Sequence, residues 1–188
     1  MLEVYSILIH FCNQKQLEEV FFGNPIPVIR IGRGKNHVFY SASIHANESI
    51  TTNILLKFIE DFCIAYRNNE KIYGYNAREI YMKTSIYIVP MCNPDGVNLV
   101  NNYYSINSKI YQSAQKIADS FATIPFPDGW KANIRGVDLN LQFPAGWEEA
   151  RRIKFAQGFT TPAPRDFVGF RSTYRTWIFG IIQLYFKT

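Results

Sequence analysis

The sequence predicts an α/β fold with a mixed, largely parallel sheet flanked by helices. Apolar, β-branched segments alternate with one long segment of helical periodicity, and this alternation is typical of parallel α/β sheets. Hydrophobic residues make up 47% of the 188 residues, which is a globular composition. The length suits a single domain, and no apolar run reaches the roughly 18 residues of a membrane helix.

Two strands and a helix are expected in the first third of the chain. The strands are residues 26–31 (IPVIRI) and 37–44 (HVFYSASI), which are rich in β-branched and aromatic residues and separated by a Gly-rich turn. The helix is expected over residues 49–66, where apolar side chains recur at helical spacing. Those side chains are Ile50, Ile54, Leu55, Phe58, Ile59 and Phe62.

A third strand and a second helix follow. Residues 81–91 (YMKTSIYIVPM) read as an apolar strand, which ends in the turn signals Asn-Pro and Asp-Gly. A helix is expected within residues 103–121. Polarity and Pro/Gly content then rise over residues 125–164, and this composition predicts long loops around a short segment at 136–141.

The cysteines and the charges suggest no further function. Cys12, Cys63 and Cys92 form no C-x-x-C pair, so we expect small buried hydrophobic residues. Three of the five net positive charges come from residues 170–188, which hold no acidic residue, and no basic stripe with interleaved aromatics is left elsewhere. We therefore expect no nucleic-acid binding.

The first fifteen residues are mildly apolar. They lack the basic segment and the small-residue cleavage site of a secretory signal. The chain as it stands therefore predicts a cytoplasmic protein without a membrane association.

His45 and Glu48 are the candidate metal ligands. They lie where the second predicted strand gives way to the helix, and ligands gather at the carboxyl ends of strands in α/β sheets. The three-residue spacing lets an imidazole and a carboxylate point at one cation from a single turn, and zinc accepts both ligand types. By itself the H-x-x-E pattern is weak, because a solvated His and a Glu at a helix start give the same letters.

Three segments in order resemble the carboxypeptidase-type zinc metallopeptidases. They are SIHANESITT at 43–52, VPMCNPDGV at 89–97 and NIRGVDLN at 133–140, within a resemblance that runs roughly from residue 23 to 169. The resemblance implies a hydrolase with one zinc ion, for which His45 and Glu48 would be ligands. It also implies the α/β fold of that family.

Two features resemble the branch of this family that cleaves γ-D-glutamyl-diaminopimelate bonds in bacterial cell-wall peptides. They are HANE followed by ITT, and GVDLNLQFPAGWE at 136–148. Digestive-type members carry an Arg where this chain has Leu141, and Leu141 cannot hold a terminal carboxylate. The resemblance therefore favours a cell-wall peptide substrate over the alternative of a general metallocarboxypeptidase.

The resemblance also implies roles for residues near the third segment. Asn140 would hydrogen-bond the substrate near its carboxylate. Lys131 and Arg135 both compete to be the cation that polarises the scissile carbonyl, and each is alternatively a solvated surface charge. Asp138 is expected to be a structural hydrogen-bonding residue. The residues expected to shape the turn after the third strand are Asn93, Asp95 and Gly96.

The zinc site of this chain is expected to be incomplete. The family has a second His ligand and a general-base Glu downstream, whereas the chain's histidines are His10, His37 and His45 and no Glu follows Glu149. A general base contributes about 10²–10⁴-fold to a rate. We therefore expect an inactive chain as it stands, with a non-catalytic remnant or a peptide-binding pseudo-enzyme as the alternative.

The two ends of the chain suggest shifts of reading frame. Codons exist for residues 170–187 that, read one base later, encode a segment similar to the family's continuation. Codons also exist for residues 9–22 that, read two bases later and with one base dropped, encode a segment similar to the family's sequence at this point. The hypothesis divides the chain into out-of-frame segments at 1–21 and 170–188 around a partial catalytic domain at 22–169. On this hypothesis the fold is incomplete at the C-terminus, and the nucleotide sequence tests it.

Overall fold

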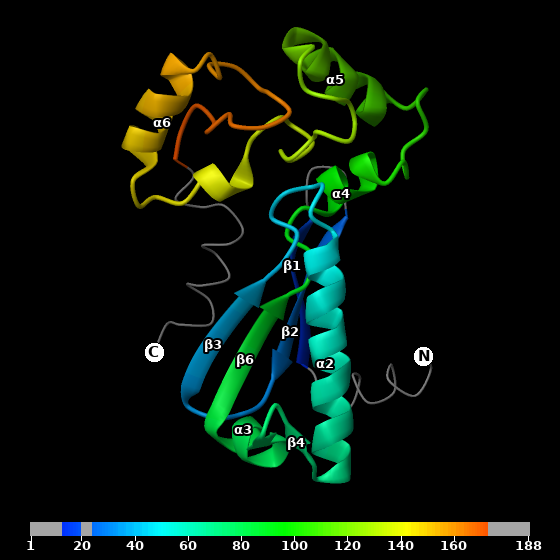
Figure 1. Ribbon diagram of the computed structural model, residues 1–188, viewed down its shortest axis with the longest axis vertical. Helices are drawn as coiled ribbons and strands as arrows, with labels where there is room; N and C mark the ends of the chain where they lie inside the picture. The colour runs from blue at the N-terminus through cyan, green and yellow to red at the C-terminus, as the bar shows by residue number, and fades with distance from the viewer. Residues whose placement is uncertain (1–12, 20–23, 173–188) are drawn as a thin grey trace.

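A four-stranded mixed sheet forms the centre of the computed structural model, which describes residues 13–19 and 24–172 (Figure 1). Its strands lie in the order β1 (Asn13–Glu19), β2 (Pro25–Ile31), β6 (Thr84–Val89) and β3 (Asn36–Ser41). β1 and β2 are antiparallel, as are β2 and β6, whereas β3 and β6 are parallel. The predicted α/β fold with a mixed sheet is therefore confirmed.

The expectation of a largely parallel sheet is wrong for these four strands, because two of the three pairings among them are antiparallel. Only the connection from β3 through a helix to β6 is the crossover that alternation predicts. β2 and β3 follow each other in sequence, yet β6 lies between them. The sequence pattern also does not predict β1, which pairs with β2.

Helix α2 (Ile50–Asn68) lies along the sheet, as Figure 1 shows in cyan, and its existence confirms the predicted amphipathic helix. Its buried residues include Ile59 and Phe62, each about 1% exposed. They belong to one apolar cluster with side chains of two strands, namely Ile29, Ile31, Ile86 and Ile88. The C-cap of the helix is Asn69, whose φ of 58° is left-handed, as helix C-termini favour.

The segment predicted as one strand at 81–91 is instead the end of a helix followed by a shorter strand. α3 (Ala77–Lys83) follows a small hairpin of β4 (Lys71–Ile72) and β5 (Tyr75–Asn76), and β6 begins directly after it. Asn76 caps α3 by accepting a hydrogen bond from the Glu79 amide. This cap stabilises the start of a helix whose later residues have apolar side chains that would also suit a strand.

The turn between β2 and β3 packs directly against the junction of α3 and β6. The Gly34 amide donates to the Thr84 carbonyl oxygen at 3.3 Å. A Cβ on Gly34 would lie 1.8 Å from the Lys83 carbonyl carbon, so only glycine fits there. The predicted Gly-rich turn is thus also a packing contact.

The turn predicted after the third strand is the start of a short helix, α4 (Pro94–Val100). Asn93 is its N-cap and accepts a hydrogen bond from the Gly96 amide at 3.1 Å, and Pro94 occupies the first turn. Turn signals and helix-start signals use the same residue types, which explains the difference.

The upper part of the molecule in Figure 1 holds α4, α5 (Lys109–Ala118) and α6 (Trp147–Ala156). α5 is shorter than the predicted 103–121, because Ser108 caps its start and the short 3₁₀ helix η1 (Asp119–Phe121) follows it. α6 lies in the region predicted as loops. Its surface is polar and Trp147 is its one buried residue, so no apolar stripe marks it.

The remaining expectations concern the cysteines, the membrane and the two ends. Cys63 and Cys92 are buried and not in disulfides, as predicted, whereas Cys12 lies outside the described residues. No helix of the described part is long and apolar enough to cross a membrane. Most of the segments 1–21 and 170–188 also lie outside the described residues, so the frame shifts and the incomplete C-terminus stay hypotheses.

Candidate metal centre

His45 and Glu48 lie in the loop between β3 and α2, past the carboxyl ends of the parallel strands β3 and β6. The strand predicted at 37–44 ends earlier, at Ser41. Ala42 still donates to the Val89 carbonyl oxygen at 3.0 Å, but Ser43 has a φ of 48°, which ends the extended conformation. His45 therefore lies on a bent loop rather than on a strand.

The start of α2 braces this loop. The Ser43 amide donates to Thr51 Oγ1 at 2.9 Å, and Thr51 Oγ1 donates to the Glu48 carbonyl oxygen at 2.8 Å. Ser43 Oγ and Thr52 Oγ1 lie 2.6 Å apart in a buried hydrogen bond. Two threonines in the first turn of the helix thus fix the backbone that carries Glu48.

The His45 ring lies between two carboxylates. Its Nδ1 is 3.0 Å from Glu48 Oε1 and its Nε2 is 3.1 Å from Asp138 Oδ1. The hydrogen bond with Asp138 raises the pKa of His45, burial opposes this, and Glu48 adds to the rise. The exposed fractions of the His45 and Glu48 side chains are 16% and 45%, so the pair is open to solvent on the Glu48 side.

Asp138 does more than the predicted structural role. Its Oδ1 also accepts the Asn140 amide at 3.2 Å, and its Oδ2 accepts the Asp166 amide at 3.1 Å. A carboxylate that binds one ring nitrogen of a metal-ligating His fixes which nitrogen faces the metal. The sequence signal for this was the D-x-N pattern before the 3₁₀ helix η2 (Leu139–Leu141), but nothing in it pointed to His45.

Of the two competing cations, Lys131 lies beside the pair. Its Nζ is 3.6 Å from Glu48 Oε1, and its carbonyl oxygen accepts the Ala46 amide at 3.0 Å. Arg135 is exposed, and its amide donates to Asn133 Oδ1 at 3.0 Å. Asn140 is also exposed, two residues beyond Asp138 in η2 (Leu139–Leu141).

The residues present fit part of a zinc site. An imidazole nitrogen and a carboxylate oxygen converge at 3.0 Å, both partly buried, and Asp138 occupies the other ring nitrogen. Across residues 13–19 and 24–172, no group of three His, Cys, Asp or Glu side chains could hold a metal ion. The described site therefore offers two protein ligands, one fewer than catalytic zinc sites use.

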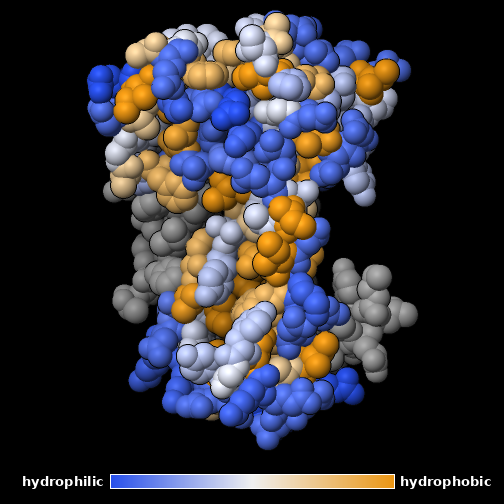
Figure 2. Space-filling model, in the orientation of Figure 1, coloured by the Kyte–Doolittle hydropathy of each residue, from blue (hydrophilic) through white to orange (hydrophobic). Residues whose placement is uncertain are grey.

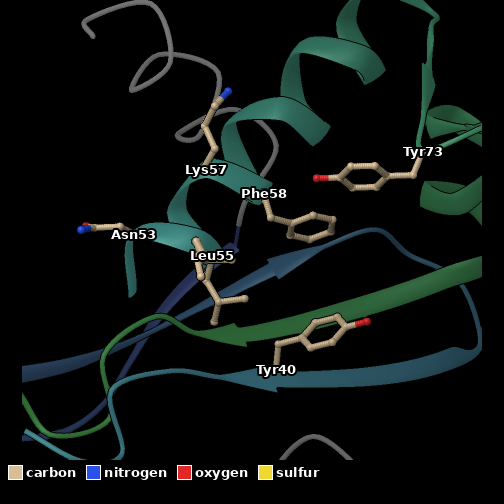
Figure 3. Close-up of a pocket in the computed structure, with 7 residues that line it drawn as sticks. Tyr40, Asn53, Leu55, Lys57, Phe58 and Tyr73 are labelled. Atoms are coloured by element: carbon tan, nitrogen blue, oxygen red, sulfur yellow. The ribbon is translucent and has the colours of Figure 1, made fainter. Parts of the chain in front are cut away.

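A separate pocket of 610 Å³ lies between α2 and β3 (Figure 3). Tyr40 and Phe58 face each other across it with ring centroids 6.3 Å apart, and Tyr73 points toward Phe58. None of its lining residues is a candidate site residue. The lining consists of Tyr40, Asn53, Ile54, Leu55, Lys57, Phe58 and Tyr73.

The fold and the site together define an α/β protein with a His–Glu pair at the carboxyl ends of parallel strands. A sequence model of the zinc carboxypeptidase family matches residues 12–173. The chain therefore belongs to the zinc carboxypeptidase family, which is a family of hydrolases.

Two relatives show what share of a family member's length this chain matches. It is 46% identical over 145 residues to the gamma-D-glutamyl-L-diamino acid endopeptidase 1 of Lysinibacillus sphaericus, covering 77% of this chain and 35% of that protein. It is 35% identical over 161 residues to the uncharacterized protein YqgT of Bacillus subtilis (strain 168), covering 85% of this chain and 41% of that protein. The chain thus spans between a third and a half of these relatives.

Solved structures show the same fold. The crystal structure of thrombin activatable fibrinolysis inhibitor matches with a TM-score of 0.65 and 16% identity, over 97% of this chain and 40% of that one. The bovine protein in complex with tick carboxypeptidase inhibitor matches with a TM-score of 0.59, also at 16% identity, over 97% and 52% of the two chains. At this identity the matches concern the fold alone.

Proposed function

We propose that the protein functions as a peptidase that hydrolyses γ-D-glutamyl-diamino acid amide bonds in bacterial cell-wall peptides. The observation that carries this proposal is the His45 ring, whose Nδ1 faces Glu48 while Asp138 holds its Nε2. The 46% identity to a gamma-D-glutamyl-L-diamino acid endopeptidase supports the substrate class. Leu141 after Asn140 supports it over a general metallocarboxypeptidase, because Leu141 offers no charge for a terminal carboxylate.

In this proposal one zinc ion is held in part by His45 and Glu48, and it supplies Lewis acidity toward the amide carbonyl and a more acidic water. With the proton on Nε2, where the Asp138 carboxylate would accept it, His45 would offer Nδ1 to the metal. Lys131 holds a positive charge beside Glu48, where it would stabilise the charge that develops on the carbonyl oxygen. This contact favours Lys131 over Arg135 for that role. Asn140, which is exposed, would hydrogen-bond the peptide.

A second candidate function is peptide binding without catalysis. The described residues supply two ligands, and the chain's histidines are His10, His37 and His45, none of which follows the Asn140 segment. A zinc ion with two protein ligands is held weakly. This observation favours a pseudo-enzyme or a remnant for the 188-residue chain acting alone.

Hydrolysis of a γ-D-glutamyl-diaminopimelate peptide distinguishes the two candidates. The 188-residue chain is incubated with the peptide and zinc, and the products are separated by chromatography, with and without a chelator. Turnover that disappears with the chelator and in His45→Ala, but persists in the control His37→Ala, supports the peptidase. Peptide binding that resists the chelator, without turnover in any variant, supports the pseudo-enzyme and contradicts catalysis by this chain.

A further inference from the structure

Asp166 combines a left-handed backbone conformation with a side chain that is paired with two cations. It follows α6 in the loop at 157–169, and its φ of 68° lies in the left-handed region. Residues other than glycine seldom adopt this conformation, although Asp and Asn tolerate it better than β-branched residues do. A left-handed Asp in a loop therefore needs contacts that hold it there.

Two cations bind different oxygens of the Asp166 carboxylate. Lys154 Nζ, on α6, is 2.6 Å from its Oδ1, and Arg165 Nε is 2.7 Å from its Oδ2. Both oxygens are thus occupied by charged donors, in a side chain that is only 16% exposed. Burial opposes ionisation, but the hydrogen bonds from Lys154 and Arg165 keep the pKa of Asp166 below its usual value.

The conformation of Asp166 aims its amide at the metal centre. That amide donates to Asp138 Oδ2 at 3.1 Å, while Asp138 Oδ1 accepts from the His45 ring at 3.1 Å. The same loop is tied to the site at other points. The Asp138 amide donates to the Phe167 carbonyl oxygen at 2.9 Å, and the Lys131 amide donates to the Pro164 carbonyl oxygen at 2.8 Å.

We propose that Asp166 is a positioning residue for the metal centre, which sets the orientation of the His45 ring through Asp138. The chain of contacts runs from Lys154 on α6 to Asp166, then to Asp138 and to His45 Nε2. The two oxygens of Asp138 are divided between the Asp166 amide and the ring, so the carboxylate plane is fixed by both. This inference rests on the proposed function in taking His45 as a zinc ligand.

Two substitutions at Asp166 test the effect of its backbone conformation and leave the rest of the loop unchanged. Asp166→Asn keeps a residue that tolerates positive φ and keeps an oxygen for the cations, whereas Asp166→Val does neither. Asn69→Val is the matched control, because Asn69 has a similar φ of 58° at the far end of α2. Thermal unfolding of each variant shows which of them fold.

The primary measurement is the tautomer of His45, from the ¹⁵N chemical shifts of its ring in the neutral state. We expect the proton on Nε2 in the wild type and in Asn69→Val, a mixture of both tautomers in Asp166→Val, and a smaller share of the second tautomer in Asp166→Asn, which keeps one of the two anchors. A wild-type tautomer in Asp166→Val overturns the proposal. So does an equal mixture in Asn69→Val, because it would show that general destabilisation moves the ring.

Zinc titration of the same samples is the second measurement. We expect Asp166→Val to weaken zinc binding about three- to tenfold, less than the 10–100-fold loss that is typical for a direct partner of a ligand such as Asp138. Absence of zinc binding in every variant contradicts the proposed function, while the tautomer measurement still decides the role of Asp166.

Lys154 provides the test if Asp166→Val does not fold. Lys154→Met removes one anchor of the carboxylate from a partly exposed position on α6, and Lys154→Arg keeps its charge. We expect the tautomer mixture in Lys154→Met and the wild-type tautomer in Lys154→Arg. A wild-type tautomer in both variants overturns the proposal.

Discussion

Asp138 is the residue on which most contacts of the candidate metal centre converge. Its carboxylate accepts hydrogen bonds from His45 Nε2, from the Asn140 amide and from the Asp166 amide. With a side chain only 7% exposed, it depends on these donors, because a buried carboxylate without them is costly. Three segments of the chain are therefore fixed relative to one another at one side chain.

Asp138→Asn is expected to weaken zinc binding about 10–100-fold and to lower the free energy of unfolding by about 1–3 kcal/mol. The amide NH₂ of Asn would face either the His45 ring or the Asp166 amide, and both of these donate to Asp138 in the wild type. Zinc titration and denaturant unfolding measure the two effects. The control Asp119→Asn, on η1, should change neither, and equal effects of both variants would contradict the role of Asp138.

The raised pKa of His45 predicts how the stability of the metal-free protein depends on pH. Asp138 favours the charged ring in the folded state, so the folded pKa lies above the unfolded value of about 6.5. This stabilisation is fully present below pH 6.5 and is lost as the pH rises through the folded pKa.

Unfolding midpoints of the zinc-free protein across this pH range test that sign. We expect them to fall less with rising pH in His45→Gln than in the wild type, with His37→Gln as the control. A slope that is the same in all three proteins would show that His45 contributes nothing to it.

The sequence suggests the candidate ligand pair but not the residues that hold it. His45 and Glu48 are three positions apart on one turn, so local spacing is enough to suggest them. Asp138 contacts His45 across 93 positions and Asp166 contacts Asp138 across 28, and only the folded backbone brings them together. The left-handed φ of Asp166 leaves no pattern in the sequence either, because Asp is common in loops of every conformation.

At the scale of elements, Asn93 joins two parts of the molecule at the start of α4. Its Oδ1 accepts the Gly96 amide, and its Nδ2 donates to the Ala132 carbonyl oxygen at 2.9 Å. A Cβ on Gly96 would lie 2.8 Å from the Ala132 carbonyl oxygen, so the close approach of the backbone favours glycine at that position. The cap thus links α4 to the segment that carries Lys131.

Asn93→Asp and Asn93→Ala separate the contribution of the donor Nδ2 from that of the cap acceptor Oδ1. Asn93→Asp keeps the cap acceptor and loses the donor, so we expect a loss of about 1–3 kcal/mol in unfolding free energy. Asn93→Ala loses both, and we expect roughly 2–4 kcal/mol. Denaturant unfolding measures both variants.

The matched control for these variants is Asn76→Ala. Asn76 caps α3 at an exposed position by accepting the Glu79 amide, so about 1 kcal/mol is expected for its loss. If Asn93→Asp cost nothing, the contact with Ala132 would have no part in stability.

Elements that bury an apolar stripe are those that the sequence predicts best. α2 has such a stripe against the sheet, and its predicted and observed bounds differ by one residue at the start and two at the end. α6 buries little besides Trp147, and ion pairs such as Arg152–Glu149 lie on its surface, so its sequence reads as a loop. The order and direction of the strands are harder to predict from the sequence, because they depend on which strand edges meet and not on the pattern of any one segment.

At the scale of the whole molecule, the sheet leaves an edge and an apolar surface open. Among the described strands, β3 pairs with β6 on one side, and no described strand lies on its other side. Figure 2 shows hydrophobic side chains over the middle of the molecule, where Figure 1 places the sheet and α2. Tyr40 on β3, Ile54 on α2 and Tyr73 are large exposed side chains in this region. Open strand edges beside apolar surface favour association.

We therefore expect the purified chain to self-associate through β3 in a concentration-dependent manner. Tyr40→Lys should shift it toward the monomer, because a lysine on an edge strand opposes pairing with a second edge. Tyr103→Lys is the control, since Tyr103 is 80% exposed but lies in the turn after α4. Sedimentation velocity over a range of concentrations measures the association. Equal association in Tyr40→Lys and the wild type, or an equal decrease in Tyr103→Lys, would show that contacts elsewhere hold the copies together.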